Sequence, residues 1–280
     1  MNFWTKMQGV DARIIYIFMV VAIAIPLVKP IGLPMSIMPT TLQVFEFIEK
    51  LPSGSKVYIS FDYGPGQGPE LNPMSTAVLN HFFKKGFKVY AMASITEGPM
   101  VAQSMLAPFE TQGKVYGKDF INLGFFAGGE AGLAALCQDI RKVISRDFKG
   151  TPLDQIEMMK DVNKITDFAL GVTVNSGPGG YGTPEVWVRQ VPIVYNTPFV
   201  LALNAVMTPS SLPFLQAKQI TGLLGGLRAA AEYELCLKQP GMGAALMDAQ
   251  SAAHVVMIGF IILGNIAYFS LRPKRRSGGV

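Results

Sequence analysis

Acidic residues beside two glycine- and proline-rich segments are the residues of this sequence best suited to chemistry. Both segments contain Gly-Pro-Gly, a further glycine and Pro-Glu, and the first directly follows a run with strand-like character. Glycines permit the positive φ and close backbone approach that an anion-binding turn needs. We therefore predict two related half-sites. The candidate ligand-binding residues are Asp62, Gly64, Gly66, Glu70, Glu97, Glu130, Ser176, Gly179, Gly180 and Glu185.

The acids among these residues suggest a divalent cation as one cofactor. Mg²⁺ and Ca²⁺ prefer oxygen ligands, and each crossover of the predicted fold supplies a carboxylate. Glu97, Glu130 and Glu185 also fall in the first turn of predicted helices, where the helix dipole alone favours an acid. Helix capping and cation binding both remain open for them.

Nucleotide signatures are incomplete. The fragment from Gly177 to Gly182 follows a predicted strand and reads Gly-x-Gly-x-x-Gly, but proline occupies its first variable position. Neither segment has the GxxxxGK[ST] spacing of a phosphate-binding loop, and no lysine follows the glycines.

The sequence offers few residues for nucleophilic or metal catalysis. His81 falls within a predicted helix and His254 at a membrane boundary, and Cys137 and Cys236 lack metal-ligand spacing. The run from Asn175 to Gly180 resembles the glycine-rich turn of membrane-anchored signal-peptide peptidases over six residues. That resemblance implies a serine–lysine hydrolase, although no lysine is placed as the base. The pattern as a whole favours a protein that is not an enzyme.

The elements that position these residues alternate between strand-like and helix-like segments. The runs 56–61, 87–93, 120–125, 168–174 and 199–206 read as strands, with amphipathic helices between them. This alternation predicts an α/β fold with a doubly wound, mostly parallel sheet of about five strands, similar to a Rossmann fold. Ligands bind such sheets at the carboxyl ends of the strands.

Helix boundaries follow from proline and glycine. Asn72-Pro73 predicts a helix from Met74 to Lys85, and Glu130 to Ile144 reads as another. Beyond Leu212 the pattern predicts helices alone, with Ile220, Leu223, Leu224 and Leu227 on one helical face.

Two apolar segments flank this domain. The first runs from Ile14 to Val28, with Ile31 to Ile37 extending it past Lys29; the second runs from Val255 to Leu271. About 20 apolar residues span a membrane as a helix, so we predict two transmembrane helices. A cleavable signal peptide is the alternative for the first segment, but its Ala-Ile-Ala motif at 22–24 lies inside the apolar run.

Charge distribution predicts the orientation and excludes nucleic acid as a partner. The net charge of +5 comes from the ends of the chain, since residues 30–271 carry 17 Lys and Arg against 18 Asp and Glu. Four basic residues lie between Arg272 and Arg276, which places both termini in the cytoplasm and the central domain outside it. There is no basic stripe for a phosphate backbone.

Small residues on the last helix predict a helix-packing seam. They share one helical stripe, and small side chains allow close approach of helix backbones. The partner is either the chain's own first span or a second copy of the chain. The predicted seam residues are Gly241, Ala245, Asp248, Ala252 and Gly259.

These observations predict three regions: residues 1–38 as stub and anchor, 39–239 as the α/β domain, and 240–280 as helix, span and basic tail. The leading hypothesis is a two-pass membrane protein that serves as a structural or interaction subunit of a homo-oligomeric assembly, with the lipid bilayer and other membrane subunits as partners. The alternative is a membrane-anchored ligand-binding domain or hydrolase that uses the glycine- and proline-rich loops.

Overall fold

The computed structural model describes residues 11–177 and 182–271. The chain divides into two compact units: one combines the two ends of the chain, up to Pro34 and from Ala244 onward, and the other is residues 35–243.

The unit 35–243 is built on one parallel sheet of six strands in the order β3-β2-β1-β4-β5-β6. The central strands are buried on both faces, as parallel strands covered by helices usually are. The predicted α/β class with a parallel sheet is therefore confirmed. The strands are β1 (Lys56–Asp62), β2 (Lys88–Ala93), β3 (Phe120–Phe125), β4 (Leu170–Asn175), β5 (Phe199–Leu203) and β6 (Gly222–Gly225).

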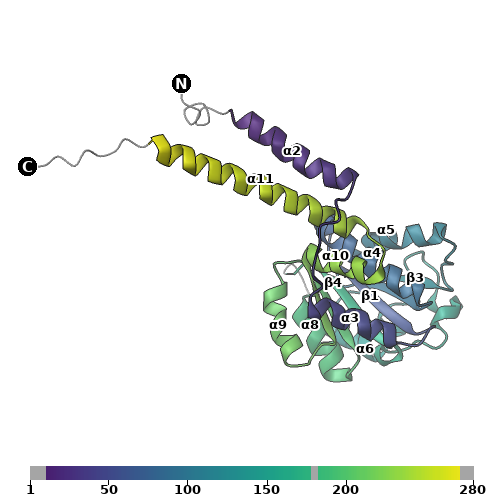
Figure 1. The fold of residues 1–280 in the computed structure, drawn as a ribbon. Helices are drawn as coiled ribbons and strands as arrows, with labels where there is room; N and C mark the ends of the chain where they lie inside the picture. Colours follow the sequence, from purple (N-terminus) through teal and green to yellow (C-terminus); the bar gives the residue numbers. More distant parts are fainter. Residues whose placement is uncertain (1–10, 178–181, 272–280) are drawn as a thin grey trace, which may run out of the picture. The chain divides into compact units, whose positions relative to one another are not determined.

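Helices cover both faces of this sheet (Figure 1), and each face has its own apolar core. The first face carries α3 (Pro39–Lys50), α4 (Gly68–Lys84), α5 (Gly98–Thr111) and α10 (Gly226–Leu237). The second face carries α6 (Gly129–Gln138), α7 (Ile140–Val143), α8 (Pro184–Val188) and the π-helix η5 (Arg189–Ile193). Further elements are α9 (Thr208–Gln216) and the 3₁₀ turns η1 (Pro65–Gln67), η2 (Leu153–Gln155), η3 (Glu157–Met159) and η4 (Ile165–Asp167).

The sixth strand corrects the prediction of helices alone beyond Leu212. The residues Leu223 and Leu224 point to opposite faces of the sheet and belong to different cores, as successive strand residues do. Gly222 lets the strand lie against α3, because a Cβ there would come 2.3 Å from Val44 Cγ2. A short strand bounded by glycines leaves too few residues to reveal its period.

Two predicted helix boundaries are also wrong. Helix α4 begins at Gly68 rather than Met74 and includes Pro73 in its second turn. The predicted helix from Glu130 to Ile144 is two helices, because Asp139 is extended (φ −155°) and its side chain caps α7 by accepting the Arg141 and Lys142 backbone N–H groups.

The other unit contains α2 (Ala12–Val28) and α11 (Met242–Leu271), which run side by side (Figure 1). The rings of Phe18 and Phe260 meet edge to face at 5.9 Å. One carboxylate fixes the turn after α2: Asp248 accepts backbone hydrogen bonds from Ile31 and Gly32 at 2.8 Å and from Leu33 at 3.2 Å.

In the described part of the chain, α11 alone is long and apolar enough to cross a membrane, from Met242 to Ser270. The predicted extension of the first segment to Ile37 is wrong. Helix α2 ends at Val28 after 17 residues, because Pro30, Pro34 and Gly32 with its φ of 72° do not continue a helix. At 1.5 Å per residue α2 is about 26 Å long.

Candidate ligand site at the carboxyl edge of the sheet

The strand order creates a natural binding position between β1 and β4. The chain runs outward from β1 through β2 to β3 and then returns to β4 on the other side of β1. The loops after β1 and β4 therefore leave in opposite directions, and ligands of open α/β sheets bind in the resulting crevice. The first glycine- and proline-rich segment follows β1, and the described residues of the second, 176–177 and 182–185, follow β4. The two half-sites stay a prediction.

Asp62 is the last residue of β1 and is buried at this switch point. Its carboxylate accepts three hydrogen bonds of 2.7 Å, from the backbone N–H and the hydroxyl of Ser94 and from the hydroxyl of Thr173. Burial raises the pKa of Asp62 above its ordinary value, and the donors from Ser94 and Thr173 oppose that rise. This residue ties β1 to β4 and to the loop after β2, so it organises the crevice rather than facing a ligand.

The loop after β4 is held by two asparagines. The side-chain oxygen of Asn175 accepts from the Gly177 backbone N–H at 2.9 Å, and the Asn204 side chain after β5 donates to the Ser176 carbonyl at 3.0 Å. Gly182 packs against Ser94 so closely that a Cβ would come 1.6 Å from the hydroxyl oxygen. The predicted residues Gly179 and Gly180 lie outside the described residues.

Glu70 links the two glycine-rich half-sites indirectly. Its carboxylate, at the start of α4, accepts the backbone N–H of Ala205 at 2.7 Å, and Ala205 follows Asn204 in the loop after β5. Gly64 lies directly before the turn η1, Gly66 lies within it, and η1 leads into α4. No side chain lies within 4 Å of an added Cβ at Gly66, so this glycine is open to solvent or ligand.

The remaining acids lie on the second face or on the rim. Glu130 pairs with Arg189 at 2.9 Å and accepts from Gln190 at 3.0 Å, and these bonds lower its pKa to about 2. Glu97, directly before α5, accepts from the Thr96 hydroxyl at 3.0 Å. Glu185 lies in the first turn of α8.

The structure thus joins Asp62, Ser176 and Glu70 through bonds to strand ends and loops, while it gives Glu97 and Glu130 separate partners. Residues 11–177 and 182–271 contain no group of three or more His, Cys, Asp and Glu side chains that could hold a metal ion. Backbone groups and hydroxyls are the polar groups that the ends of these strands offer to a ligand, and ligand binding there stays a prediction.

The predicted seam residues lie in different surroundings. Gly241 precedes α11, and its backbone N–H donates to Glu234. Ala245 and Asp248 are buried, Ala252 is half-buried, and an added Cβ at Gly259 would contact nothing within 4 Å.

Three consecutive buried residues of α10 were not predicted. Glu232 accepts from the Met38 backbone N–H at 3.1 Å and the Thr41 hydroxyl at 2.7 Å. Glu234 accepts from the Gly241 and Gly243 N–H groups at 2.9 and 2.8 Å. The two acids therefore hold residues near the two ends of the unit 35–243 against α10.

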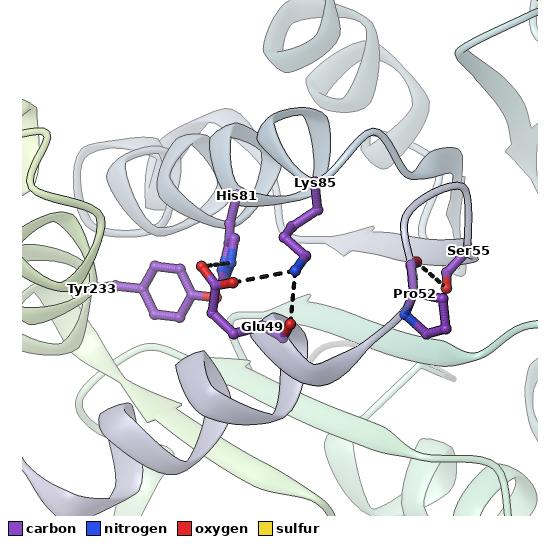
Figure 2. A network of polar contacts seen from close by, with 6 residues as sticks. All are labelled: Glu49, Pro52, Ser55, His81, Lys85 and Tyr233. Atoms are coloured by element: carbon purple, nitrogen blue, oxygen red, sulfur yellow. Dashed lines mark hydrogen bonds and ion pairs between the residues drawn. The ribbon is translucent and has the colours of Figure 1, made fainter.

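Tyr233, between these acids, joins α10 to a polar network with α3 and α4 (Figure 2). Its hydroxyl lies 2.7 Å from His81 Nδ1, and His81 Nε2 lies 3.2 Å from Glu49, which also pairs with Lys85. Burial lowers the pKa of His81, and the nearby Glu49 carboxylate opposes that shift. The sequence carries little signal for this network, because His81, Tyr233 and Glu49 lie on three helices that each contain other polar residues.

Comparison with known proteins adds no relative: no protein-family description, no curated protein and no solved structure matches the chain.

Proposed function

We propose that the chain is a two-pass membrane protein whose α/β domain is a structural or interaction subunit of a homo-oligomeric assembly. The observation that carries this proposal is the double attachment on α10. Glu232 and Glu234, two residues apart, hold both ends of the unit 35–243. Residues near each end of this unit therefore contact α10, which supports a chain that continues into an apolar helix on either side of the domain.

The pairing of α2 with α11 supports two spans. Because Phe18 meets Phe260, Val28 falls at the level of about residue 250, and Ala12 at about residue 266. Polar residues lie at both ends of this paired stretch of the two helices: Lys29 and Asp248 at one end, and Asp11 and Arg13 at the other. The paired stretch is about 24 Å long at 1.5 Å per residue, somewhat shorter than the thickness of about 30 Å of a hydrocarbon core.

An interaction role agrees with the chemistry of the domain better than catalysis does. Asp62, Glu70 and Glu130 each use their carboxylate for bonds within the fold. The basic residues after α11 favour cytoplasmic termini and an extracytoplasmic domain.

The mass of the complex, extracted gently from its native membrane, tests the proposal. We expect a uniform particle several times larger than the 30.3 kDa chain. A monomer without partners would contradict an assembly role. A phosphatase that is active only outside the cytoplasm, inserted after the exposed Gly150, should be active, whereas the same reporter after Val280 should not.

The crevice between β1 and β4 favours a second function, ligand binding without turnover. Mg²⁺, a nucleotide or a carbohydrate should raise the melting temperature of the full chain, and Glu70→Ala combined with Glu185→Ala should remove the shift. Glu157→Ala, on an exposed turn away from the crevice, is the matched control. A flat response to the whole panel would argue against a ligand site.

A further inference from the structure

His81 is a fully buried histidine at the meeting point of three helices (Figure 2). It belongs to α4, and its ring stacks on Phe45 of α3 with 4.8 Å between the ring centroids. Its two ring nitrogens lie within hydrogen-bond distance of Tyr233 on α10 and Glu49 on α3. The functions proposed above use neither this histidine nor its bonds.

The hydroxyl of Tyr233 determines which protons the ring carries. Tyr233 is fully buried, and among the described residues only His81 Nδ1, at 2.7 Å, is placed to accept its proton. A ring nitrogen accepts a hydrogen bond only when it carries no proton, so Nδ1 is unprotonated and Nε2 carries the hydrogen of a neutral imidazole. That hydrogen can be donated to Glu49 Oε1 at 3.2 Å. The neutral ring therefore satisfies both of its partners.

Protonation of the ring leaves one of these groups unsatisfied. Both nitrogens of an imidazolium donate, so Nδ1–H would use the Tyr233 oxygen as an acceptor and leave the phenolic proton without one. A buried donor without an acceptor costs about 1–3 kcal/mol.

The charges that face the ring offset little of this cost. Glu49 attracts an imidazolium, but its side chain is 42% exposed and also pairs with Lys85, and exposed pairs contribute little. The ammonium groups of Lys84 and Lys85 repel the imidazolium. Cys236, near Tyr233, is a neutral thiol, because burial raises its pKa. Acid therefore acts against the contact between the three helices.

Helix α3 is the element of this contact that burial holds least. Three of its twelve residues are buried, against eleven of seventeen in α4 and eight of twelve in α10. Segments with few buried groups open locally before a whole domain unfolds. The last two turns of α3 contact His81 through Phe45 and Glu49. The first turn is held separately, by the bond from Thr41 to Glu232.

We propose that His81 is an acid-sensitive switch: protonation of its ring releases the last two turns of α3 from α4 and α10, while the sheet stays folded. Water that enters the opened contact solvates the imidazolium and accepts the phenolic proton of Tyr233. Uptake of one proton drives the opening, and its loss at neutral pH restores the contact. The switch lies within the unit 35–243 and depends on neither a membrane span nor an oligomer.

Amide hydrogen exchange of the full chain in detergent, corrected for the intrinsic exchange rate at each pH, tests the release. From pH 7.5 to 5.5 the amides of residues 45–50 should exchange up to about tenfold faster, the limit for one histidine with an ordinary pKa of about 6.5 in the open state. The amides of β1 should not. His81→Gln cannot be protonated in this range and should abolish the acceleration. His254→Gln, at an exposed histidine of α11, is the matched control and should leave it intact.

Glu49→Gln distinguishes this switch from a general loss of stability in acid. The amide keeps an acceptor for Nε2–H but removes the charge that attracts the imidazolium. The ratio of the exchange rates at pH 5.5 and 7.5 should therefore be larger than in the wild type.

The ¹⁵N spectrum of the histidine rings tests the placement of the protons without a change at His81. At pH 7.5 Nδ1 of His81 should be unprotonated and Nε2 protonated, and His254→Gln assigns the signals of the two rings.

A proton on Nδ1 at pH 7.5 overturns the proposal, whether or not a variant at His81 folds. Equal exchange at the two pH values overturns it, as does an acceleration that persists in His81→Gln or decreases in Glu49→Gln. An acceleration that β1 shares also overturns it, because acid then unfolds the whole domain.

Discussion

The carboxyl edge of the sheet and the middle of α10 both bury carboxylates, with different results. At the edge, Asp62 binds Ser94 and Thr173 and so fixes the ends of neighbouring strands. In α10, Glu232 and Glu234 bind backbone groups at the two ends of the domain. The first arrangement holds strand ends together, and the second holds residues near the two ends of the domain. The comparison teaches that the buried acids Asp62, Glu232 and Glu234 each join segments that lie apart along the chain.

The largest expected effect is at the attachment. Glu232→Ala removes a fully buried carboxylate and leaves the Thr41 hydroxyl, the Met38 N–H and the Nε–H of Arg228 without their acceptor. We expect the free energy of unfolding to fall by about 3 kcal/mol, measured by urea denaturation and tryptophan fluorescence. Glu46→Gln, exposed on α3, is the control and should change it by less than about 0.5 kcal/mol. Equal losses of stability in Glu232→Ala and Glu46→Gln would contradict the stabilising role of the buried Glu232 carboxylate.

A smaller loss is expected at the crevice. Asp62→Asn keeps one acceptor but turns an amide N–H₂ toward donors from Ser94 and Thr173, so we expect about 2 kcal/mol of destabilisation in the same assay. Glu97→Gln on the rim serves as the control. If Asp62→Asn is more stable than the wild type, the bonds from Ser94 and Thr173 do not offset the cost of burying the Asp62 carboxylate.

Acid should weaken the network around Tyr233. Because the pKa of His81 is lowered in the folded state, the unfolded chain binds more protons, and stability present above about pH 6.5 is lost as pH falls below it. Titration of His81 changes the free energy of unfolding by at most about 1.4 kcal/mol per pH unit. The lowered pKa of Glu49 adds a loss only below about pH 4.5, while the raised pKa of Asp62 acts in the opposite sense there.

Denaturation at pH 5.5 and 7.5 measures this dependence. His81→Gln should flatten it between these values, and the exposed change Lys160→Gln, at a residue that does not contribute to the pKa shift of His81, should leave it intact. If the free energy of unfolding of His81→Gln depends on pH as strongly as that of the wild type, the pH dependence comes from groups other than His81.

The smallest effect is expected on the rim. Arg189→Gln should return the pKa of Glu130 from about 2 toward about 4.3, followed by carboxyl NMR, with little change in unfolding. The control is Arg146→Gln, because the described contacts of the Arg146 side chain include only the Gly150 carbonyl. This variant should leave the pKa of Glu130 unchanged.

Strand and helix alternation made the class of fold predictable, because the strands from Lys56, Lys88 and Phe199 are apolar runs between clear turn signals. The sequence did not predict β6, because Leu223 and Leu224 are the only residues of this strand with side chains. Two residues are too few to tell the period of two of a strand from the period of 3.6 of a helix.

The position of the two glycine- and proline-rich segments was predictable in part, because they follow β1 and β4, which are neighbours in the sheet. The bonds of its acids were not, because the partners of Glu70 and Glu130 lie 135 and 59 residues away. Glu232 and Glu234 escaped notice because acids in a helix usually face water.

The attachment on α10 also has a consequence for chain connectivity. Residues near both ends of the unit 35–243 contact the same helix. Joining Met35 to Gly243 by a linker and opening the chain at the exposed turn of Gly113 should therefore shift the termini and keep the order of the strands in the sheet, as domains commonly tolerate.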